Sequence, residues 1–470
     1  MSTRYETVIG LETHIELKTE TKAFCSCSVV FGAKPNTHCC PVCTGMPGAI
    51  PVLNERAVEY AVKAGLLLHC HVSLWSRMDR KNYYYPDLPK AYQISQYDHP
   101  ICTDGWLDIP AAGGTKRIRI ERLHLEEDAG KLMHGEGGTL LDCNRCGVPL
   151  IEIVTKPDFR SAAEVTAYLQ ELRERIRFAG LSDCKMNEGS LRCDVNLSLR
   201  PIGSRRLGER AELKNLNSFQ FAAKAIAYEE ERQAAVLDAG GTLFAETRGF
   251  DEKTGQTFPM RPKETQEDYR FFPEPDLPPI VLSPETVARW ESELPELPAA
   301  RRARYLDQYG VNRETAELLT MSRAVSDTFE EAAALTRYPR QLATLLASDP
   351  ARLEGEAIPV SAPHLAALAD LAGEKTIGTG TARELLTLLW REDQDPREAV
   401  ARLGLGKVTD RDALADLARE VIADCPRAAA DFRAGKTAAL QALLGQMMRR
   451  TRGRADPSLA REALLSLLLL

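Results

Sequence analysis

Acids and histidines alternate with apolar residues in several short segments, which is how a β-strand presents polar groups on a single face. In residues 11–17 this face would carry Glu12, His14 and Glu16. The segment 118–128 repeats the pattern and ends in three consecutive acids. Neighbouring carboxylates repel one another, so a face of this kind needs a metal ion or basic side chains to compensate its charge.

Two more segments extend this set of acids. Glu152 stands among apolar residues in 150–154, and Arg192 and Asp194 alternate with apolar residues in 191–199. An isolated carboxylate in apolar surroundings is a candidate for a functional site. Together the segments could form an oxygen-rich Mg²⁺ site that also takes substrate phosphates. For any one strand alone, an ordinary solvent-facing polar face is the favoured alternative.

Five of the twelve cysteines lie between Cys25 and Cys43. Cys25 and Cys27 form one close pair, Cys40 and Cys43 form a second, and twelve residues separate the pairs. Two such turns supply the four soft ligands of a structural Zn²⁺ site. The alternative, a set of reduced and partly buried thiols, is disfavoured by this density of cysteines.

The neighbouring cysteines leave the exact ligand set open. Cys39 is a spare thiol beside Cys40, and His38 could replace one of the ligands. Cys143 and Cys146 form a further pair with two residues between them, but no second pair lies near them in the sequence. We therefore expect Cys143 and Cys146 to stand apart from the zinc site.

Several motifs that indicate other chemistry are missing. The segment Gly435-Lys436-Thr437 lacks the first glycine of a phosphate-binding loop, because Ala430 occupies that place. The sequence has no G-x-S-x-G elbow, no H-E-x-x-H motif and no amidase signature rich in glycine and serine. We therefore expect that this chain does not hydrolyse an amide itself.

The overall charge argues against a protein coated with nucleic acid, because the 470 residues carry a net charge of -7. One local exception lies between residues 427 and 454. This segment contains seven basic residues and one acid, Asp431. The basic residues could form a phosphate-binding patch or simply a solvated helix face. The seven are Arg427, Arg433, Lys436, Arg449, Arg450, Arg452 and Arg454.

The composition, 44% hydrophobic and 27% charged residues, is typical of a soluble globular protein. The N-terminal sequence has no signal-peptide pattern, and no apolar stretch reaches the length of a membrane span. We expect a cytoplasmic protein without a membrane partner. Cysteines in such a protein indicate metal binding or scattered thiols more than disulfides.

The residue pattern changes along the chain. Up to about residue 290 it predicts an α+β domain rich in antiparallel strands. Ser283-Pro284 has the form of a helix start, and the sequence beyond it is helical in character. Thr381 and Glu384 form a candidate capping box, and Gly404-Leu405-Gly406 is typical of a break between two helical domains.

Long stretches of the chain resemble the B-subunit family of the amidotransferases that act on Asp-tRNA(Asn) and Glu-tRNA(Gln). The matching blocks run from about residue 9 to about residue 280, and the basic stretch GQMMRRTRGRADP matches the family's tail. Motifs this long and this numerous are highly specific. They include GLETHIEL, CCPVCTGMPGAIPVLN, DRKNYYYPDLPKAYQISQYD, HLEEDAGKL, NRCGVPLIEIV, MNEGSLRCDVNLSLR and ELKNLNSF.

The resemblance implies an α+β cradle domain in 1–292 with a large antiparallel sheet, similar to glutamine synthetase and carrying a zinc-binding insertion. A helical domain in 293–404 and a small helical tail in 405–470 that contacts tRNA would follow. It also implies that ATP phosphorylates the side-chain carboxylate of Glu or Asp on misacylated tRNA. Ammonia, made from glutamine by the amidase (the A-subunit) and channelled to this chain, would then form the amide; the small C-subunit completes the complex.

The resemblance also assigns residues by position. Glu12, His14, Glu127 and Glu152 would hold the catalytic Mg²⁺, with Glu126 as a close neighbour, because a metal that neutralises the γ-phosphoryl lets a carboxylate attack it. The ATP would be surrounded by Lys81, Tyr83, Arg192, Asp194, Glu212 and Lys214. A structural Zn²⁺ would be held by Cys25, Cys27, Cys40 and Cys43. This chain departs from the family pattern at Cys39, Cys143 and Cys146.

Two other functions remain as alternatives. A non-catalytic tRNA-binding scaffold would use the zinc site and the basic tail, but it would not need Glu12, His14, Glu127 and Glu152 to converge. A free-standing ligase acting on a small acid is disfavoured, because a small substrate would not require a basic helical tail.

Overall fold

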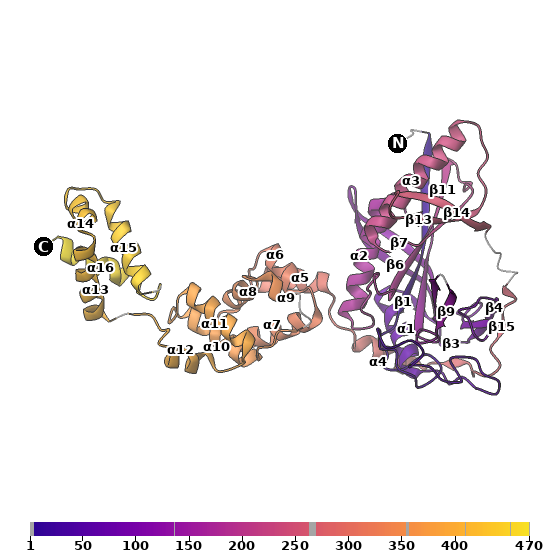
Figure 1. The fold of residues 1–470 in the computed structure, drawn as a ribbon, viewed down its shortest axis with the longest axis horizontal. Helices are drawn as coiled ribbons and strands as arrows, with labels where there is room; N and C mark the ends of the chain where they lie inside the picture. Colours follow the sequence, from indigo (N-terminus) through magenta and orange to yellow (C-terminus); the bar gives the residue numbers. More distant parts are fainter. Residues whose placement is uncertain are drawn as a thin grey trace. The chain divides into compact units, whose positions relative to one another are not determined.

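The computed structural model describes residues 4–135, 137–262, 269–353, 357–408, 410–451 and 453–469. The chain forms two compact units, Met1–Pro295 and Glu296–Leu470. The first is built on a nine-stranded sheet, and the second is helical (Figure 1). Within the ranges given above, no helix has both the length and the apolar character of a membrane span.

The central sheet of the first unit has the strand order β14-β13-β12-β11-β1-β10-β7-β6-β2. All neighbouring strands run antiparallel except β12 and β13, which run parallel. The helix α3 (Phe219–Asp238) lies between these two strands in the sequence and supplies the long crossover that a parallel pair needs. The predicted antiparallel sheet is therefore correct for all pairs but one. The strands are β1 (Tyr5–Glu16), β2 (His71–Val72), β6 (Cys102–Ala111), β7 (Gly114–Glu127), β10 (Pro149–Thr155), β11 (Leu191–Pro201), β12 (Ala211–Lys214), β13 (Glu246–Asp251) and β14 (Gln256–Pro262).

Helices cover one face of this sheet. α1 (Glu55–Leu67) and α2 (Ala162–Phe178) contact β6, and α3 contacts β11 and β14 (Figure 1). The apolar strand residues of that face, such as Ile15, Ile151 and Val195, are completely buried. Because neighbouring residues of a strand point in opposite directions, the acids between these apolar residues lie on the other face of the sheet.

A small sheet is attached to the acidic end of β7. It consists of β4 (Asp79–Asn82), β5 (Tyr92–Ser95) and β15 (Phe272–Pro273), in the order β15-β4-β5. The Gln93 side chain of β5 donates a hydrogen bond of 2.8 Å to the backbone carbonyl of Glu127, and the Ile94 amide donates one of 3.0 Å to the Glu127 side chain. Two further ribbons pair β3 (Trp75–Ser76) with β16 (Ile280–Val281), and β8 (Lys131–Gly135) with β9 (Gly138–Asp142).

The helices of the C-terminal half have local start and stop signals. Ser283 caps α4 with Pro284 in its first turn, and Gly404 ends α12 in a left-handed conformation with φ of 58°, both as predicted. The predicted capping box at Thr381 is wrong. The N-cap of α11 is Gly378, three residues before Thr381, and Thr381 is buried inside the helix, where its side chain packs and does not cap.

The second unit contains two separate apolar cores. One gathers residues between Tyr305 and Val400, and the other gathers residues between Leu414 and Leu468. The predicted boundary near residue 404 falls between these cores but stays a prediction, as does the likeness of the first unit to glutamine synthetase. The helix α4 (Pro284–Ser292) belongs to the first unit and contacts α1. The helices of the second unit are α5 (Pro298–Gln308), α6 (Arg313–Leu319), α7 (Arg323–Leu335), α8 (Pro339–Leu346), α9 (Pro350–Leu353), α10 (Ala362–Gly373), α11 (Thr379–Arg391), α12 (Pro396–Leu403), α13 (Arg411–Asp424), α14 (Pro426–Arg433), α15 (Ala439–Arg450) and α16 (Pro457–Leu468).

Some of the basic residues between 427 and 454 already have acidic partners in the same unit. Arg450 pairs with Glu420 at 3.2 Å, and Lys436 pairs with Asp431 at 2.9 Å. Arg452 lies outside the described residues. A phosphate would therefore compete with internal ion pairs at two of these positions, and phosphate binding by this segment stays a prediction.

The first core of the second unit should depend strongly on Phe329, which is completely buried in α7. We expect Phe329→Ala to lower the free energy of unfolding of this unit by about 3–5 kcal/mol, because the truncation leaves a cavity. Leu335→Ala is the matched control, since Leu335 ends the same helix and is 59% exposed. It should change the stability by less than about 0.5 kcal/mol. Urea denaturation measures both changes, and equal effects would contradict the assigned core.

Candidate active site and metal centre

The register of four strands aligns polar residues across the open face of the sheet. His14 of β1 lies opposite Arg192 of β11 on one side and opposite Glu152 of β10 on the other. Glu152 in turn lies opposite His124 of β7. This row requires nothing beyond strand pairing with a period of two, so each side chain is positioned by the backbone that carries it.

Two histidines and two glutamates make close contacts in this row, and we call them the histidine cluster. The Nε2 atom of His14 is 3.7 Å from Glu126 Oε1 and 3.6 Å from Glu152 Oε2. The Nε2 atom of His124 is 3.5 Å from Glu126 Oε2 and 3.1 Å from Glu152 Oε2. Glu126 also accepts a hydrogen bond of 3.1 Å from the Ser95 hydroxyl of β5.

The charges in the histidine cluster reinforce one another. Burial acts to lower the pKa of His124, but the charge of Glu152 and the hydrogen bond to Glu126 raise it to about 9. Burial acts to raise the pKa of Glu152, but His124 and His14 hold it well below its ordinary value. Both carboxylates of the cluster are therefore held as anions, which is the form that binds a metal ion.

A second group of acids lies beside the histidine cluster on the same face, and we call it the carboxylate cluster. Glu12 of β1 lies opposite Asp194 of β11, and Glu212 follows on β12. The Lys214 ammonium is 2.6 Å from Asp194 and 3.2 Å from Glu212, while the Asn196 side chain donates a hydrogen bond of 2.9 Å to Glu12. Burial acts to lower the pKa of Lys214, but these two acids outweigh it and raise the pKa.

Both clusters have the spacing of metal ligands. In each of the sets His14, Glu126, Glu152 and Glu12, Asp194, Glu212, one ligand atom from every residue lies within 4.8 Å of the others. Mg²⁺ prefers oxygen ligands, so the carboxylate cluster fits it best. The imidazole of the histidine cluster also suits Mn²⁺ and other transition metals.

The predicted set of four Mg²⁺ ligands does not meet at one point. Glu12 and His14 belong to different clusters, because they are two residues apart on β1 and each faces a different neighbour. Glu127 belongs to neither group. The adjacent Glu126, predicted as a catalytic residue but not as a metal ligand, points to the same face as His124 and shares the cluster with His14 and Glu152.

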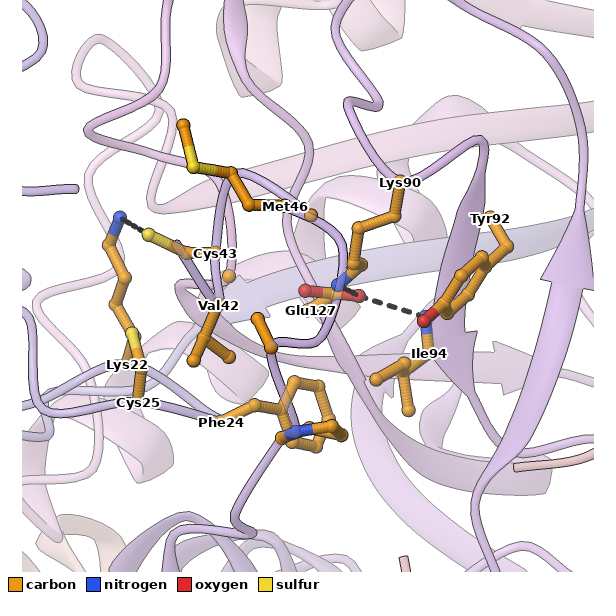
Figure 2. A pocket seen from close by; sticks show the side chains of 14 residues that line it. Lys22, Phe24, Cys25, Val42, Cys43, Met46, Lys90, Tyr92, Ile94 and Glu127 are labelled. Carbon is orange, nitrogen blue, oxygen red and sulfur yellow. Dashed lines mark hydrogen bonds and ion pairs between the residues drawn. The ribbon is translucent and has the colours of Figure 1, made fainter. Parts of the chain in front are cut away.

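Glu127 instead points toward the cysteine-rich segment. Its Oε1 atom pairs with the Lys90 ammonium and accepts a hydrogen bond of 3.0 Å from the Ile94 amide (Figure 2). A cavity of about 80 Å³ lies between this pair and the segment that carries Cys25 and Cys43. Figure 2 shows residues of both segments around it.

The side chains of four cysteines converge as their spacing predicted. The Sγ atoms of Cys25, Cys27, Cys40 and Cys43 all lie within 4.8 Å of one another. A Zn²⁺ ion with Zn–S bonds of about 2.3 Å holds its sulfur ligands about 3.8 Å apart, so the group fits a tetrahedral zinc site. The hydrogen bond from Cys25 lowers the pKa of Cys43 to about 4, despite the opposing effect of burial.

A buried lysine provides an independent sign that negative charge collects here. Lys22 is completely buried, and its ammonium lies 3.5 Å from Cys43 Sγ and 3.1 Å from the Cys143 carbonyl (Figure 2). No acid pairs with it in the part of the chain that the structure describes. A buried ammonium without a counter-charge is strongly disfavoured, whereas four thiolates around one Zn²⁺ carry the net negative charge that it needs.

Cys143 and Cys146 are not among the four converging thiols, as expected, but they do not lie far from them. They are buried with Cys43 in one cluster, against which the other cysteines of this region pack. Asn36 forms the link, because its Oδ1 accepts a hydrogen bond of 2.7 Å from the Cys143 amide and its carbonyl accepts one of 3.3 Å from Cys39. The contact joins residues that are more than 100 positions apart in the sequence, so spacing alone could not reveal it.

Two residues assigned to the nucleotide lie at the small sheet and not on the nine-stranded sheet. Lys81 belongs to β4, and Tyr83 follows this strand directly. Arg192 lies opposite His14 on β11, and its guanidinium donates a hydrogen bond of 2.6 Å to Asp128. No role was predicted for His124 from the sequence, because its contact with Glu152 depends on the register between β7 and β10, which the sequence does not reveal.

Comparison with known families identifies two segments. Residues 7–288 match the GatB/GatE catalytic domain, and residues 327–468 match the GatB domain. The first contains every residue of the two clusters and of the cysteine site. The second covers the helices from α7 to α16.

Curated relatives match along almost the whole chain. The B-subunit of the aspartyl/glutamyl-tRNA(Asn/Gln) amidotransferase of Caldicellulosiruptor saccharolyticus is 48% identical, with 98% of each chain covered. The protein of the same name from Caldanaerobacter subterraneus subsp. tengcongensis is 47% identical over 98% of each chain. A protein of Clostridium acetobutylicum, named as the second B-subunit of this amidotransferase, is 44% identical, also over 98% of each.

The cysteine site predicts a specific loss of metal. We expect Cys40→Ser to remove most of about one equivalent of bound zinc, because three thiolates leave the tetrahedral site incomplete. Elemental analysis of the purified protein measures this change. Cys425→Ser is the matched control, since Cys425 lies at the start of α14 in the other unit and should leave the zinc content unchanged. Equal zinc in the wild type and both variants would contradict the site.

Proposed function

Because this chain belongs to the GatB family, the B-subunits of the tRNA-dependent amidotransferases, we propose that it activates the carboxyl group of an amino acid attached to tRNA. In this reaction, ATP phosphorylates the side-chain carboxylate of Glu-tRNA(Gln) or Asp-tRNA(Asn). Ammonia then displaces phosphate and leaves Gln-tRNA(Gln) or Asn-tRNA(Asn). The whole complex is a glutamine-hydrolysing ligase that forms a carbon–nitrogen bond.

The observation that carries this proposal is the meeting of two ligand clusters on one face of the sheet. Transfer of a phosphoryl group to a carboxylate brings together several negative charges, and catalysis consists mainly of holding and neutralising them. We assign Mg²⁺ to Glu12, Asp194 and Glu212 and a second cation to His14, Glu126 and Glu152. Bound there, these cations would neutralise phosphoryl oxygens and polarise the carboxylate.

The protein's own side chains have separate roles in this scheme. Lys214 orients Asp194 and Glu212 toward one another, and His124 keeps Glu126 and Glu152 in their anionic forms. Arg192, which faces His14 across the strand pair and binds Asp128, adds a positive charge beside the histidine cluster that suits phosphate oxygens.

The cysteine site has a structural role in the proposal. All four zinc positions would be filled by protein ligands, which leaves no place for a substrate. The site stiffens a segment that has few regular elements and holds one wall of the cavity beside Glu127. Gly45, in that wall, has a φ of 68°, and a Cβ atom there would come within 2.5 Å of the Lys90 side chain, so glycine is required.

We further propose that the chain works in a complex with an amidase, the A-subunit, and with a small C-subunit. The sequence has no amidase signature, so the ammonia must be made by another chain. The helical C-terminal segment would contact the tRNA. A non-catalytic scaffold is a weaker reading, because a scaffold gains nothing from six ligand groups arranged in two clusters.

The first test removes a ligand of the histidine cluster. In the assembled complex, we expect Glu152→Ala to lower ATP hydrolysis dependent on Glu-tRNA by at least about 100-fold, because a buried ligand and the partner of His124 are both lost. Glu121→Ala is the matched control, since Glu121 lies on β7 but is exposed and pairs with the neighbouring Arg122 and with Lys156. Unchanged turnover in Glu152→Ala would leave the scaffold as the better account.

The second test concerns the carboxylate cluster. We expect Asp194→Asn to raise the Mg²⁺ concentration needed for half-maximal activity by about 10-fold or more, because one anionic ligand becomes neutral. A magnesium titration at saturating ATP and Glu-tRNA measures this shift. If the variant loses activity but keeps the wild-type Mg²⁺ dependence, Asp194 does not serve this cation.

A further inference from the structure

Four aromatic rings form a continuous row beside the acidic end of β7. Tyr97 stacks on Phe271 with ring centres 4.3 Å apart and planes inclined by 9°. Phe271 meets Tyr269 edge-on at 6.1 Å, and Tyr269 meets Tyr83 edge-on at 5.9 Å. We call these four residues the aromatic row. Each contact lies in the range of favourable aromatic pairs, so the row forms one ordered surface.

The row lies next to the histidine cluster. Tyr97 is two residues from Ser95, whose hydroxyl donates a hydrogen bond of 3.1 Å to Glu126. Tyr97 itself is 39% exposed. At the other end of the row, burial and the charges of Glu126, Asp87 and Glu127 raise the pKa of Tyr83. A ligand that lies along the row would therefore be close to the proposed reaction centre.

The Lys81 side chain places a cation over two rings of the row, Tyr269 and Tyr83. The Lys81 ammonium lies 4.8 Å from the ring centre of Tyr269 and 5.6 Å from that of Tyr83. Lys90 and Lys214, nearby lysines of this unit, are both paired with carboxylates, but Lys81 forms no ion pair with any acid in the ranges that the structure describes. Ring faces hold a cation in place and leave its charge available to an anion.

Stacked rings together with an available cation match the chemistry of a nucleotide strand. Proteins bind single-stranded nucleic acid by stacking bases on aromatic side chains and by pairing phosphates with basic residues. We propose that the aromatic row binds the single-stranded 3′ end of the aminoacyl-tRNA. A terminal base stacks at Tyr97 and Phe271, and a backbone phosphate pairs with Lys81. This inference rests on the proposed function and specifies how its substrate is positioned.

The position of the row favours the tRNA end over ATP. Tyr97 of the row follows β5, and β5 is hydrogen-bonded to β7, which carries Glu126 of the histidine cluster. The carboxylate cluster, which suits the Mg²⁺ of ATP, is formed by β1, β11 and β12 on the other side of β10. Lys81 and Tyr83 would thus serve the tRNA and not the nucleotide to which the family resemblance assigns them.

Removal of one ring in the assembled complex tests this proposal. We expect Tyr97→Leu to weaken the binding of Glu-tRNA(Gln) about 10-fold, because one stacking surface is lost, and to change the KM for ATP by less than about twofold. Tyr97→Phe keeps the ring and should restore tRNA binding. Phe244→Leu is the matched control for loss of an exposed aromatic side chain, since Phe244 is 74% exposed and lies outside the row.

Two further measurements separate stacking from a general structural defect. A tRNA that lacks its terminal adenosine should bind the wild-type complex more weakly, and it should bind the wild-type and Tyr97→Leu complexes almost equally. Lys81→Gln should lower the slope of the logarithm of the tRNA binding constant against the logarithm of salt concentration by about one, as expected for one lost phosphate contact.

The outcomes distinguish this inference from the proposed function. Binding of tRNA is measured without turnover, so an inactive wild-type complex would overturn the proposed function and leave the binding experiment interpretable. A rise in the KM for ATP with unchanged tRNA binding would assign the row to the nucleotide and overturn the inference. So would tRNA and ATP parameters in Tyr97→Leu that both equal those of the wild type.

Discussion

The arrangement of the site depends on the register of β1 between β10 and β11. Glu12 and His14 lie two residues apart on this strand, so they share a face but meet different partners. A shift of one residue would turn both side chains toward the helices and bring Thr13 and Ile15 to the open face. The apolar residues Leu11, Ile15, Ile151 and Val195 prevent this shift, because they are buried on the helix-covered face. Packing on one face therefore determines the chemistry on the other.

Charge compensation explains how so many acids can occupy one face. The carboxylates of the two clusters have basic or hydrogen-bonding neighbours within a few ångströms, such as His124 for Glu152, Lys214 for Asp194 and Asn196 for Glu12. Without these partners the buried acids would take up protons, because burial raises the pKa of a carboxyl group. The same neighbours limit where a cation can bind, since they occupy the sides of the clusters that face the protein.

The sequence was sufficient for those features that depend on local spacing. Alternation in residues 11–17 predicted which side chains share a face, and the two cysteine pairs predicted the group of four thiols. Ser283 and Gly404 marked helix ends correctly because their signals act within one turn. The capping box at Thr381 failed because tertiary packing buried that side chain and the helix started earlier.

Features that depend on pairing between distant strands could not be read from spacing. Nothing local distinguishes Glu126 from Glu127, and only the direction of β7 sends the first to His14 and the second to Lys90. In the same way, Cys143 meets the cysteine-rich segment through contacts between distant loops, such as the hydrogen bonds of Asn36 and Lys22. The family resemblance named the right segments, but the register decides which residue of each segment lies where the chemistry is proposed.

One link between the cysteine-rich segment and the sheet runs through Lys90 and Glu127. Glu127 follows Glu126 on β7, so any displacement of Glu127 moves a ligand of the histidine cluster as well. Lys90 binds Glu127 and also packs against Gly45 of the zinc segment. A structural zinc site in this place can thus influence catalysis without touching substrate, because it fixes the wall against which Lys90 and Glu127 rest. The cysteine-rich loop and the acidic face are therefore in direct contact, although about 80 residues of sequence separate Cys43 from Glu127.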